Sequence, residues 1–399
     1  MVEKIKFILQ KFITLICAVW AIPIVLIIRI IYPIILIRVG TFFSSRIGHF
    51  VADSAQQFIE LNNKVGNIVD FYWLDTWSCN KQWAKMVKRN LPVYWWVKYI
   101  DIWNHYLPGG SRHSRPSSIT RSRDINGVLE KNQTGMMCFI SEEEKEAKEW
   151  LRKQGWRDGD FFVCLLVRDS EYLDSEQVYS EYDWDYHSYR NSDVNTYVEA
   201  MEWLSKQGVW VIRMGKAMSK RISTKKSRII DYAFCSNKND LLDIWLFANC
   251  NLCISTASGI DYVSDVYRKP LLYLNYLPLN DMVSWSNSIN YPKHLKWSDS
   301  DNFLTLEEHL EHGYSYTKEY EEAGIDIIDL TSDEITLVVQ ECWARLEGTF
   351  METDDDTNQQ NQFWKKMRES ALFKKQHDFI HPKSHLASTF LRNNPNFLR

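Results

Sequence analysis

The chain has 399 residues, 45% of them hydrophobic, and a formal net charge of -4. This length has room for two or three domains with sizeable cores, and the charge excludes the strongly basic character that is typical of nucleic-acid-binding proteins. The eight cysteines are scattered, several inside apolar runs, which favours reduced, buried thiols in a cytoplasmic protein over a disulfide framework.

The N-terminus carries an apolar run. Residues 12–28 contain no charged side chain, lysines precede them, and residues 30–37 continue the run after Arg29. The run is slightly short for a spanning helix, which needs about 20 residues, and Pro23 and Pro33 interrupt helical hydrogen bonding. We therefore expect residues 1–33 to be a membrane-associated segment that lies in one leaflet near anionic headgroups. A transmembrane helix and a buried hairpin are the alternatives.

Strand-like and helix-like patterns alternate over residues 34–140, which predicts a first α/β domain with a parallel sheet. The predicted strands are residues 34–40, 67–75 and 93–100, and the predicted helices are residues 46–63 and 80–90. Residues 107–133 are rich in Gly, Ser, Pro and Arg, and we interpret them as a mobile loop or linker.

Residues 141–347 predict a second open α/β domain of five or six strands. The predicted strands are residues 160–169, 209–215, 227–233, 251–256, 271–275 and 325–330, and helices are predicted to begin near Ser141, Asp193, Leu241, Asp261 and Thr331. Residues 348–399 form a C-terminal tail. We expect its acidic beginning to be a solvated surface segment and a helix to follow.

Three predicted strands of the second domain end in residues that suit an anion. Two of them end in arginine, whose fork binds phosphate oxygens bidentately. The third ends in small residues, whose N–H groups and helix start favour phosphate. The residues at these three ends are Arg168, Asp169, Ser170, Arg213, Gly215, Ser255, Thr256, Ser258 and Gly259. Because the carboxyl ends of parallel strands share one sheet edge, together they predict a diphosphate pocket. An arginine paired with a carboxylate and a capped turn are the alternatives.

A polar stretch, residues 187–193, precedes one predicted helix of this domain. Ser192 or Asp193 would cap the helix, and Arg190 beside it would either contact the anion or fasten the loop. The polar and aromatic residues 171–192 are interpreted as a lid.

The turn after the first predicted strand holds Arg46, Gly48 and His49. A histidine there would face a cleft between the two domains and take a proton from a hydroxyl group. A helix-start histidine bonded to a carbonyl is the alternative, and Asp169 is the competing general base. The sequence contains neither a Walker-type phosphate loop nor a dinucleotide fingerprint.

As a set, these stretches resemble the glycosyltransferases of bacterial surface-polysaccharide gene clusters, such as O-antigen and capsule clusters. The resemblance is collinear from Arg46 to the closing residues 390–398, through residues 163–173, 187–204 and 240–259. It implies a GT-B fold, in which two Rossmann-like domains face a cleft. Residues 34–140 would be the acceptor-side domain and residues 141–347 the nucleotide-sugar domain, and the resemblance implies that the helix of the C-terminal tail returns toward the first domain.

The resemblance also implies a reaction and a set of roles. The donor domain is similar to that of fucosyltransferase-like enzymes, whose strand-end arginine holds the nucleotide diphosphate, and Arg168 matches that arginine. The implied enzyme moves a sugar from a nucleotide sugar to a lipid-linked saccharide in the membrane, at the cytoplasmic face of the inner membrane. No metal or other cofactor is expected, because arginines and helix dipoles neutralise the leaving diphosphate. Leu166 stands where the resemblance would put a histidine, and this departure keeps a second hypothesis open: a non-catalytic, membrane-tethered nucleotide-sugar or glycan binding protein.

Overall fold

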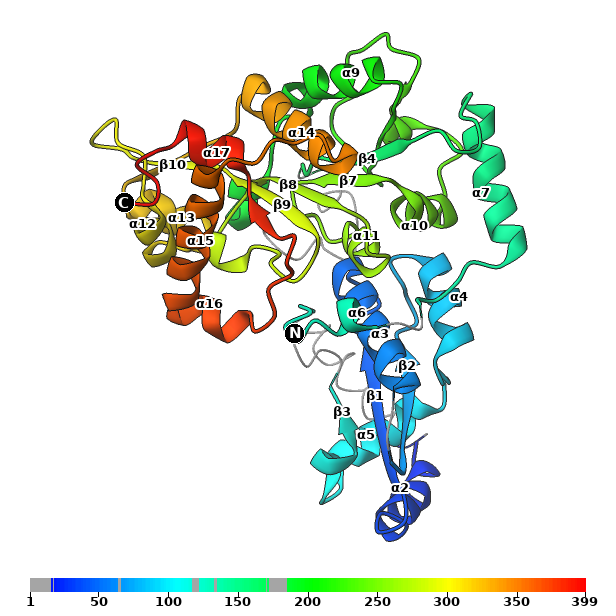
Figure 1. Ribbon diagram of the computed structural model, residues 1–399. Coiled ribbons are helices and arrows are strands. Elements are labelled where there is room, and N and C mark those ends of the chain that lie inside the picture. Colours follow the sequence, from blue (N-terminus) through cyan, green and yellow to red (C-terminus); the bar gives the residue numbers. More distant parts are fainter. Residues whose placement is uncertain are drawn as a thin grey trace, which may run out of the picture. The chain divides into compact units, whose positions relative to one another are not determined.

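The chain forms two compact units, each with its own parallel sheet. The computed structural model describes residues 16, 18–63, 66–116, 122–132, 135–169, 171 and 185–399 (Figure 1). The first unit comprises Met1–Ser122 and Asn132–Phe139, and the second comprises Arg123–Lys131 and Ile140–Arg399. The predicted α/β class with parallel sheets is confirmed.

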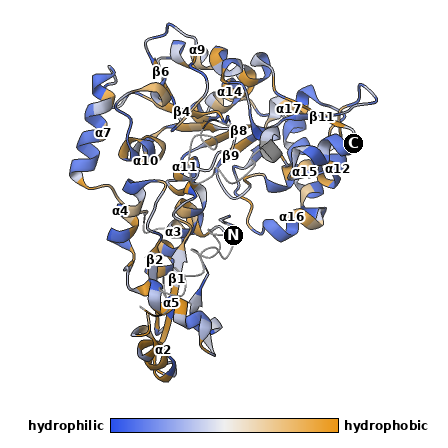
Figure 2. Ribbon diagram, turned by 180° about the vertical axis from the view of Figure 1, so that it is seen from behind, coloured by the Kyte–Doolittle hydropathy of each residue, from blue (hydrophilic) through white to orange (hydrophobic). Residues whose placement is uncertain are grey.

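The first unit is built on a three-stranded parallel sheet in the order β2-β1-β3. Its strands are β1 (Leu36–Phe42), β2 (Ile68–Leu74) and β3 (Ser114–Arg115), and its helices are α2 (Ala21–Ile30), α3 (Ile47–Asn62), α4 (Lys81–Asn90) and α5 (Val97–Tyr106). Helix α2 is apolar along its length (Figure 2). Its buried side chains pack with α5 and β1 in one core, which consists of Ala21, Val25, Ile28, Val39, Val97 and Ile100.

The predicted strand at residues 93–100 is wrong. Val93 makes only an isolated bridge to Tyr72, and the chain is helical from Val97 onward. Val97, Ile100 and Asn104 are buried and lie at helical spacing on α5. A short apolar run fits a buried strand and a buried helix equally well, so the packing of α5 against α2 decides between them.

Part of the predicted membrane-associated segment, residues 1–15 and Cys17, lies outside the described residues. Most of the remainder is α2. In the part of the chain that the structure describes, no helix is both long enough and apolar enough to cross a membrane.

The region predicted as a mobile loop or linker contains short ordered elements. These are a 3-10 turn, η1 (Gly110–His113), strand β3 and helix α6 (Val128–Lys131). The Asp124 carboxylate accepts the N–H groups of Val128 at 2.7 Å and Leu129 at 2.9 Å, and so caps α6. The described part of this region is therefore fastened to the fold.

The second unit contains a seven-stranded sheet in the order β12-β9-β8-β7-β4-β5-β6, in which every pair is parallel. The strands are β4 (Phe162–Leu166), β5 (Trp210–Arg213), β6 (Ile229–Ile230), β7 (Leu252–Ser255), β8 (Leu271–Tyr276), β9 (Ser288–Pro292) and β12 (His385–Leu386). Five of the six predicted strands correspond to β4–β8, whereas β9 and the tail strand β12 were not predicted. The predicted strand at 325–330 exists as β11 (Ile325–Ile328), but it pairs antiparallel with β10 (His294–Trp297) in a separate small sheet.

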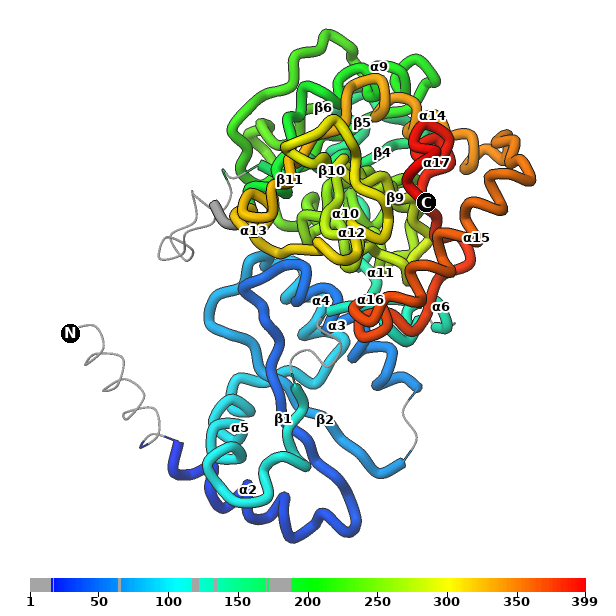
Figure 3. Tube along the Cα trace, turned by 90° about the vertical axis from the view of Figure 1, so that its left-hand side faces the viewer, coloured from blue at the N-terminus to red at the C-terminus, as the bar shows by residue number. Residues whose placement is uncertain are grey.

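Helices cover both faces of the large sheet, as its buried, almost wholly apolar central strands require. Helices α9 (Val198–Lys206) and α14 (Ser332–Glu347) lie on one face, and α10 (Asp240–Asn249) and α11 (Tyr262–Val266) on the other (Figures 1 and 3). The remaining elements of the unit are α7 (Ser141–Lys153), η3 (Asp185–Arg190), η4 (Val194–Tyr197), η5 (Tyr232–Phe234), η6 (Leu279–Asp281), α12 (Leu306–Glu311) and α13 (Thr317–Glu322).

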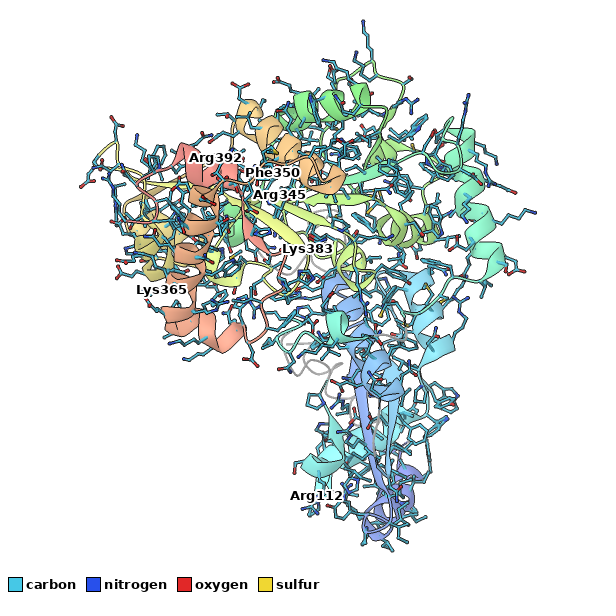
Figure 4. The ribbon with its side chains drawn as sticks, viewed as in Figure 1. Arg112, Arg345, Phe350, Lys365, Lys383 and Arg392 are labelled. Atoms are coloured by element: carbon cyan, nitrogen blue, oxygen red, sulfur yellow. The ribbon has the colours of Figure 1, made fainter. Side chains whose placement is uncertain are left out.

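The C-terminal tail belongs to the second unit. It forms α15 (Asp354–Glu369), α16 (Ala371–Gln376), the edge strand β12 and α17 (Ser388–Asn393). Its acidic beginning is mostly exposed, as expected for a solvated surface segment, but it is helical and two of its side chains, Asp356 and Gln360, are buried. Thr353 caps α15, and the buried Asp356 pairs with Arg392 of α17 at 2.5 Å and 2.7 Å. The Arg392 guanidinium also lies over the Phe350 ring, together with Arg345 (Figure 4).

Candidate functional site

The carboxyl ends of β4 and β7 are joined directly. The two strands are neighbours in the sheet, with Leu166 opposite Ser255. The Arg168 N–H donates to the Thr256 hydroxyl at 2.9 Å, and the Thr256 N–H donates to the Leu166 carbonyl at 3.1 Å. Two of the three predicted strand ends therefore form one hydrogen-bonded edge.

The polar stretch before α9 reaches the same edge. The Ser192 N–H donates to the Arg168 carbonyl at 3.1 Å. The Arg190 guanidinium donates to the Ala257 carbonyl at 2.5 Å. Both arginine side chains are half-buried, so each retains a face toward solvent. The structure thus brings Arg168, Arg190 and the turn 255–259 together at the carboxyl edge.

Two buried polar residues that the sequence did not single out hold this stretch in place. The Asn275 amide, at the end of β8, donates to the Ser192 hydroxyl at 3.0 Å and to the Tyr197 hydroxyl at 2.8 Å. The Lys293 ammonium, just after β9, donates to the Asn191 carbonyl at 2.7 Å and to Asp329 at 2.5 Å. Burial lowers the pKa of Lys293, and Asp329 opposes this effect. A polar residue at a strand end was the available signal for both.

The turn 255–259 already contains a carboxylate. Asp261, which is almost fully buried, accepts the Ser255 hydroxyl at 2.6 Å and the Ser258 N–H at 3.2 Å. Burial raises the pKa of Asp261, and these hydrogen bonds oppose the shift, together with one from the Gly259 N–H. For Ser255, Ser258 and Gly259 this geometry matches the capped-turn alternative. A phosphate at this edge would therefore be contacted chiefly by the two guanidinium groups.

The strand end at Arg213 has a different environment. Its side chain is 1% exposed and pairs with Asp231 at 3.0 Å. Its guanidinium also lies 5.5 Å from the centre of the Phe234 ring. Gly215 lies in the turn that follows, where a Cβ would collide with the Met218 side chain. This burial favours the alternative in which the arginine pairs with a carboxylate, rather than contact with a ligand.

The acidic candidates fasten neighbouring loops. Asp169 accepts the Ser219 N–H at 2.9 Å and the Ser219 hydroxyl at 3.0 Å. Asp193 caps η4 by accepting the Asn195 N–H at 3.0 Å, and it pairs with Lys220 at 3.2 Å. The hydrogen bond from Asn195 is the main cause that lowers the pKa of Asp193. Ser170 and most of the predicted lid lie outside the described residues.

The acceptor-side candidates lie at the start of α3 in the first unit. Arg46 is the residue before the helix, and its carbonyl accepts the Phe50 N–H at 2.9 Å. Gly48 and His49 lie in the first helical turn. The Nδ1 atom of His49 contacts the hydroxyl of Ser122. Ser122 is buried and has a left-handed backbone with φ of 61°.

No cluster of three or more His, Cys, Asp or Glu side chains that could hold a metal ion occurs among the residues that the structure describes.

Comparison with known proteins yields matches among solved structures only. No protein-family model matches the sequence, and no curated protein matches it. A glycosyl transferase of family 9 from Veillonella parvula aligns with 64% of this chain and 86% of its own, at 11% identity and a TM-score of 0.43. The E. coli ADP-heptose LPS heptosyltransferase II aligns with 61% and 85%, at 11% identity and a TM-score of 0.37. The E. coli heptosyltransferase WaaC with ADP aligns with 64% and 90%, at 11% identity and a TM-score of 0.33. Similarity this low does not assign an activity to this chain.

Proposed function

We propose that the protein is a GT-B glycosyltransferase that binds the diphosphate of a nucleotide sugar at the carboxyl edge of β4 and β7. The observation that carries the proposal is the meeting of Arg168 and Arg190, from separate segments, at this edge. In parallel α/β sheets ligands bind at the carboxyl ends of the strands. A pair of guanidinium groups suits a diphosphate, because each offers a planar fork of donors.

In the proposed reaction, the bond between the sugar's anomeric carbon and the diphosphate oxygen breaks, and a bond to an acceptor oxygen forms. Negative charge develops on the leaving diphosphate, and Arg168 and Arg190 would stabilise it. The acceptor hydroxyl gives its proton to a base. His49 is the proposed base, and Asp169 is the competitor.

The acceptor proposed is a lipid-linked saccharide at the cytoplasmic face of the inner membrane, in surface-polysaccharide biosynthesis. The apolar N-terminal region supports a membrane location, and the collinear resemblance of the sequence supports the pathway.

The second candidate is a protein that binds a nucleotide sugar without transferring it. Two observations favour it. Leu166, which stands where the resemblance would put a histidine, is buried in β4. In addition, the carboxylate of Asp261 occupies the hydrogen-bond donors of the adjacent turn.

The test compares donor binding and turnover in matched variants. Nucleoside diphosphates should raise the thermal midpoint of the wild-type protein as their concentration increases, because they bind only the folded state. Arg168→Ala should abolish this shift and lower turnover by about a hundredfold or more. Arg157→Ala, at an exposed position of the same unit, is the control and should behave as wild type.

Three outcomes separate the hypotheses. Donor binding with release of the nucleotide supports the transferase. Donor binding without transfer to any glycan acceptor, and without hydrolysis, supports the binding protein. Normal binding and turnover in Arg168→Ala would remove the diphosphate assignment.

A further inference from the structure

Helix α2 carries one charged side chain, Arg29, and is otherwise apolar, although only one side of it is buried. Ala21, Val25 and Ile28 face the core of the first unit. The opposite side exposes Leu26, Ile27 and Ile30, with Ile30 75% exposed. A helix that is hydrophobic all round normally lies in a protein core or in a membrane, so the exposed side calls for an apolar partner.

The exposed apolar surface continues beyond this helix, through aromatic contacts. The Trp20 ring contacts Tyr99 edge-on at 5.8 Å, and Tyr99 contacts Trp95 at 6.1 Å. Trp95 is 75% exposed. We call the surface formed by Trp20, Leu26, Ile27, Ile30, Ile34 and Trp95 the apolar patch. Singly exposed apolar side chains are ordinary, whereas a connected patch marks an interaction site.

The charged side chains of the segments that form the apolar patch are mostly basic. Residues 18–38 and 93–115 contain five basic side chains, which are Arg29, Arg38, Lys98, Arg112 and Arg115, and a single acidic one, the buried Asp101.

Two of the basic side chains are engaged with carboxylates, Arg38 with Asp70 and Arg115 with Glu60. Arg112 lies instead over the ring of Tyr32, 4.5 Å from its centre, at the same end of the unit as α2 (Figure 4). Arg29 is bonded to the Asn104 amide oxygen at 2.5 Å, and Lys98 lies 5.2 Å from the centre of the Trp73 ring.

We propose that the apolar patch docks onto a lipid bilayer that contains anionic headgroups. Aliphatic side chains would enter the acyl region, and Trp20 and Trp95 suit the boundary between the acyl chains and the headgroups. Arg29, Lys98 and Arg112 would contact lipid phosphates. Asp75 is within electrostatic reach of Lys98 and opposes this field. The inference extends the proposed membrane location beyond residues 1–33 to α5 and the loop before it, and it does not depend on glycosyl transfer.

The experiment measures sedimentation of the full chain with vesicles. The wild type should bind vesicles of phosphatidylcholine mixed with phosphatidylglycerol more tightly than vesicles of phosphatidylcholine alone. Arg112→Ala should weaken binding to the anionic vesicles by about fivefold. Ile27→Glu combined with Ile30→Glu should weaken binding to both kinds of vesicle by about tenfold or more. The control is Met351→Glu, which places the same charge on an 83% exposed position of the second unit.

Each variant is first checked for an unchanged thermal midpoint and for unchanged nucleoside diphosphate binding, which separates this test from that of the proposed function. Vesicle binding by the double glutamate variant at the wild-type level overturns the proposal. The proposal is also overturned if the wild type does not bind vesicles but forms a dimer in sedimentation analysis, and the double glutamate variant does not form that dimer. The patch would then be an interface between two copies.

Discussion

Replacing Asn275 tests whether the carboxyl edge depends on buried positioning residues. Asn275 is 1% exposed and makes three hydrogen bonds: its amide donates to Ser192 and Tyr197, and its carbonyl oxygen accepts the Leu330 N–H at 2.9 Å. Its φ is 53°, in the left-handed region that asparagine tolerates better than most residues.

The cost of Asn275→Ala can be built from these contacts. The hydroxyl groups of Ser192 and Tyr197 lie 3.3 Å apart and keep the hydrogen bond between them. Losing their bonds to the Asn275 amide therefore lowers the free energy of unfolding by only about 1 kcal/mol. The Leu330 N–H is left buried without its acceptor, which costs about 1–3 kcal/mol. Alanine has a Cβ but no side-chain amide to favour the left-handed region, and this adds about 1 kcal/mol to the cost of the substitution. We expect a total loss of about 3–5 kcal/mol in the free energy of unfolding, and Asn275→Gly should lose about 1 kcal/mol less because it has no Cβ.

Urea unfolding measures the stability of the two variants, and calorimetric titration with a nucleoside diphosphate measures donor affinity. Ser192 lies two residues from Arg190, so the loss of its bond to Asn275 should make residues 187–193 less well fixed. We expect the affinity of both variants for the nucleoside diphosphate to fall by about tenfold. Asn249→Ala, which removes an amide bonded within α10, should leave the affinity unchanged. A stability loss of the expected size with unchanged donor affinity would show that Asn275 supports the fold and not Arg190.

Two further predictions concern titration in the second unit. The hydrogen bond from Arg392 holds the pKa of Asp356 well below its usual range, so the pair stabilises the fold above the unfolded pKa near 4, and this contribution is lost as the pH falls toward the folded value. Arg392→Ala should therefore cost about 2 kcal/mol at neutral pH and progressively less below pH 4, and a pH-independent cost in urea unfolding would contradict this. Burial lowers the pKa of His309 to about 3, so its neutral form is required and wild-type stability should fall as the pH drops below about 6.5, by up to about 1.4 kcal/mol per pH unit. His309→Phe should flatten that part of the profile, and an unchanged slope would show that other groups cause it.

The strand pattern made the second sheet predictable, and the exceptions have local causes. Central strands such as β4 and β7 are apolar runs bounded by polar turns, which a parallel sheet requires. Strand β12 has only two residues, so no periodicity exists to detect, and it forms because the tail lies along β9. The strand prediction for residues 93–100 failed for a different reason, because an apolar run of this length fits a buried strand and a buried helix equally well.

The sequence could predict only the part of the candidate site that lies at the ends of neighbouring parallel strands. Parallel pairing puts the ends of β4 and β7 together, so Arg168 and Thr256 could be expected to meet. Asn275 and Lys293 were not predicted, because their bonds to Ser192 and Asn191 span 83 and 102 residues of sequence. Their place at or just after a strand end marks them as candidates, but contacts this distant in sequence leave no periodic or short-range pattern that identifies their partners.

Arg168 and Arg213 show how one sequence signature leads to two environments. Each follows or ends an apolar strand, and β4 and β5 are neighbours. Strand β5 lies beside β6, which is followed directly by Asp231, and this carboxylate captures the Arg213 guanidinium. On its other side, β4 lies beside β7, which ends in hydroxyl residues that bind the Arg168 backbone, and Arg168 itself is half-buried. The neighbouring strand therefore decides whether a strand-end arginine is buried against a carboxylate, as Arg213 is, and a prediction from strand ends must include the end of each neighbouring strand.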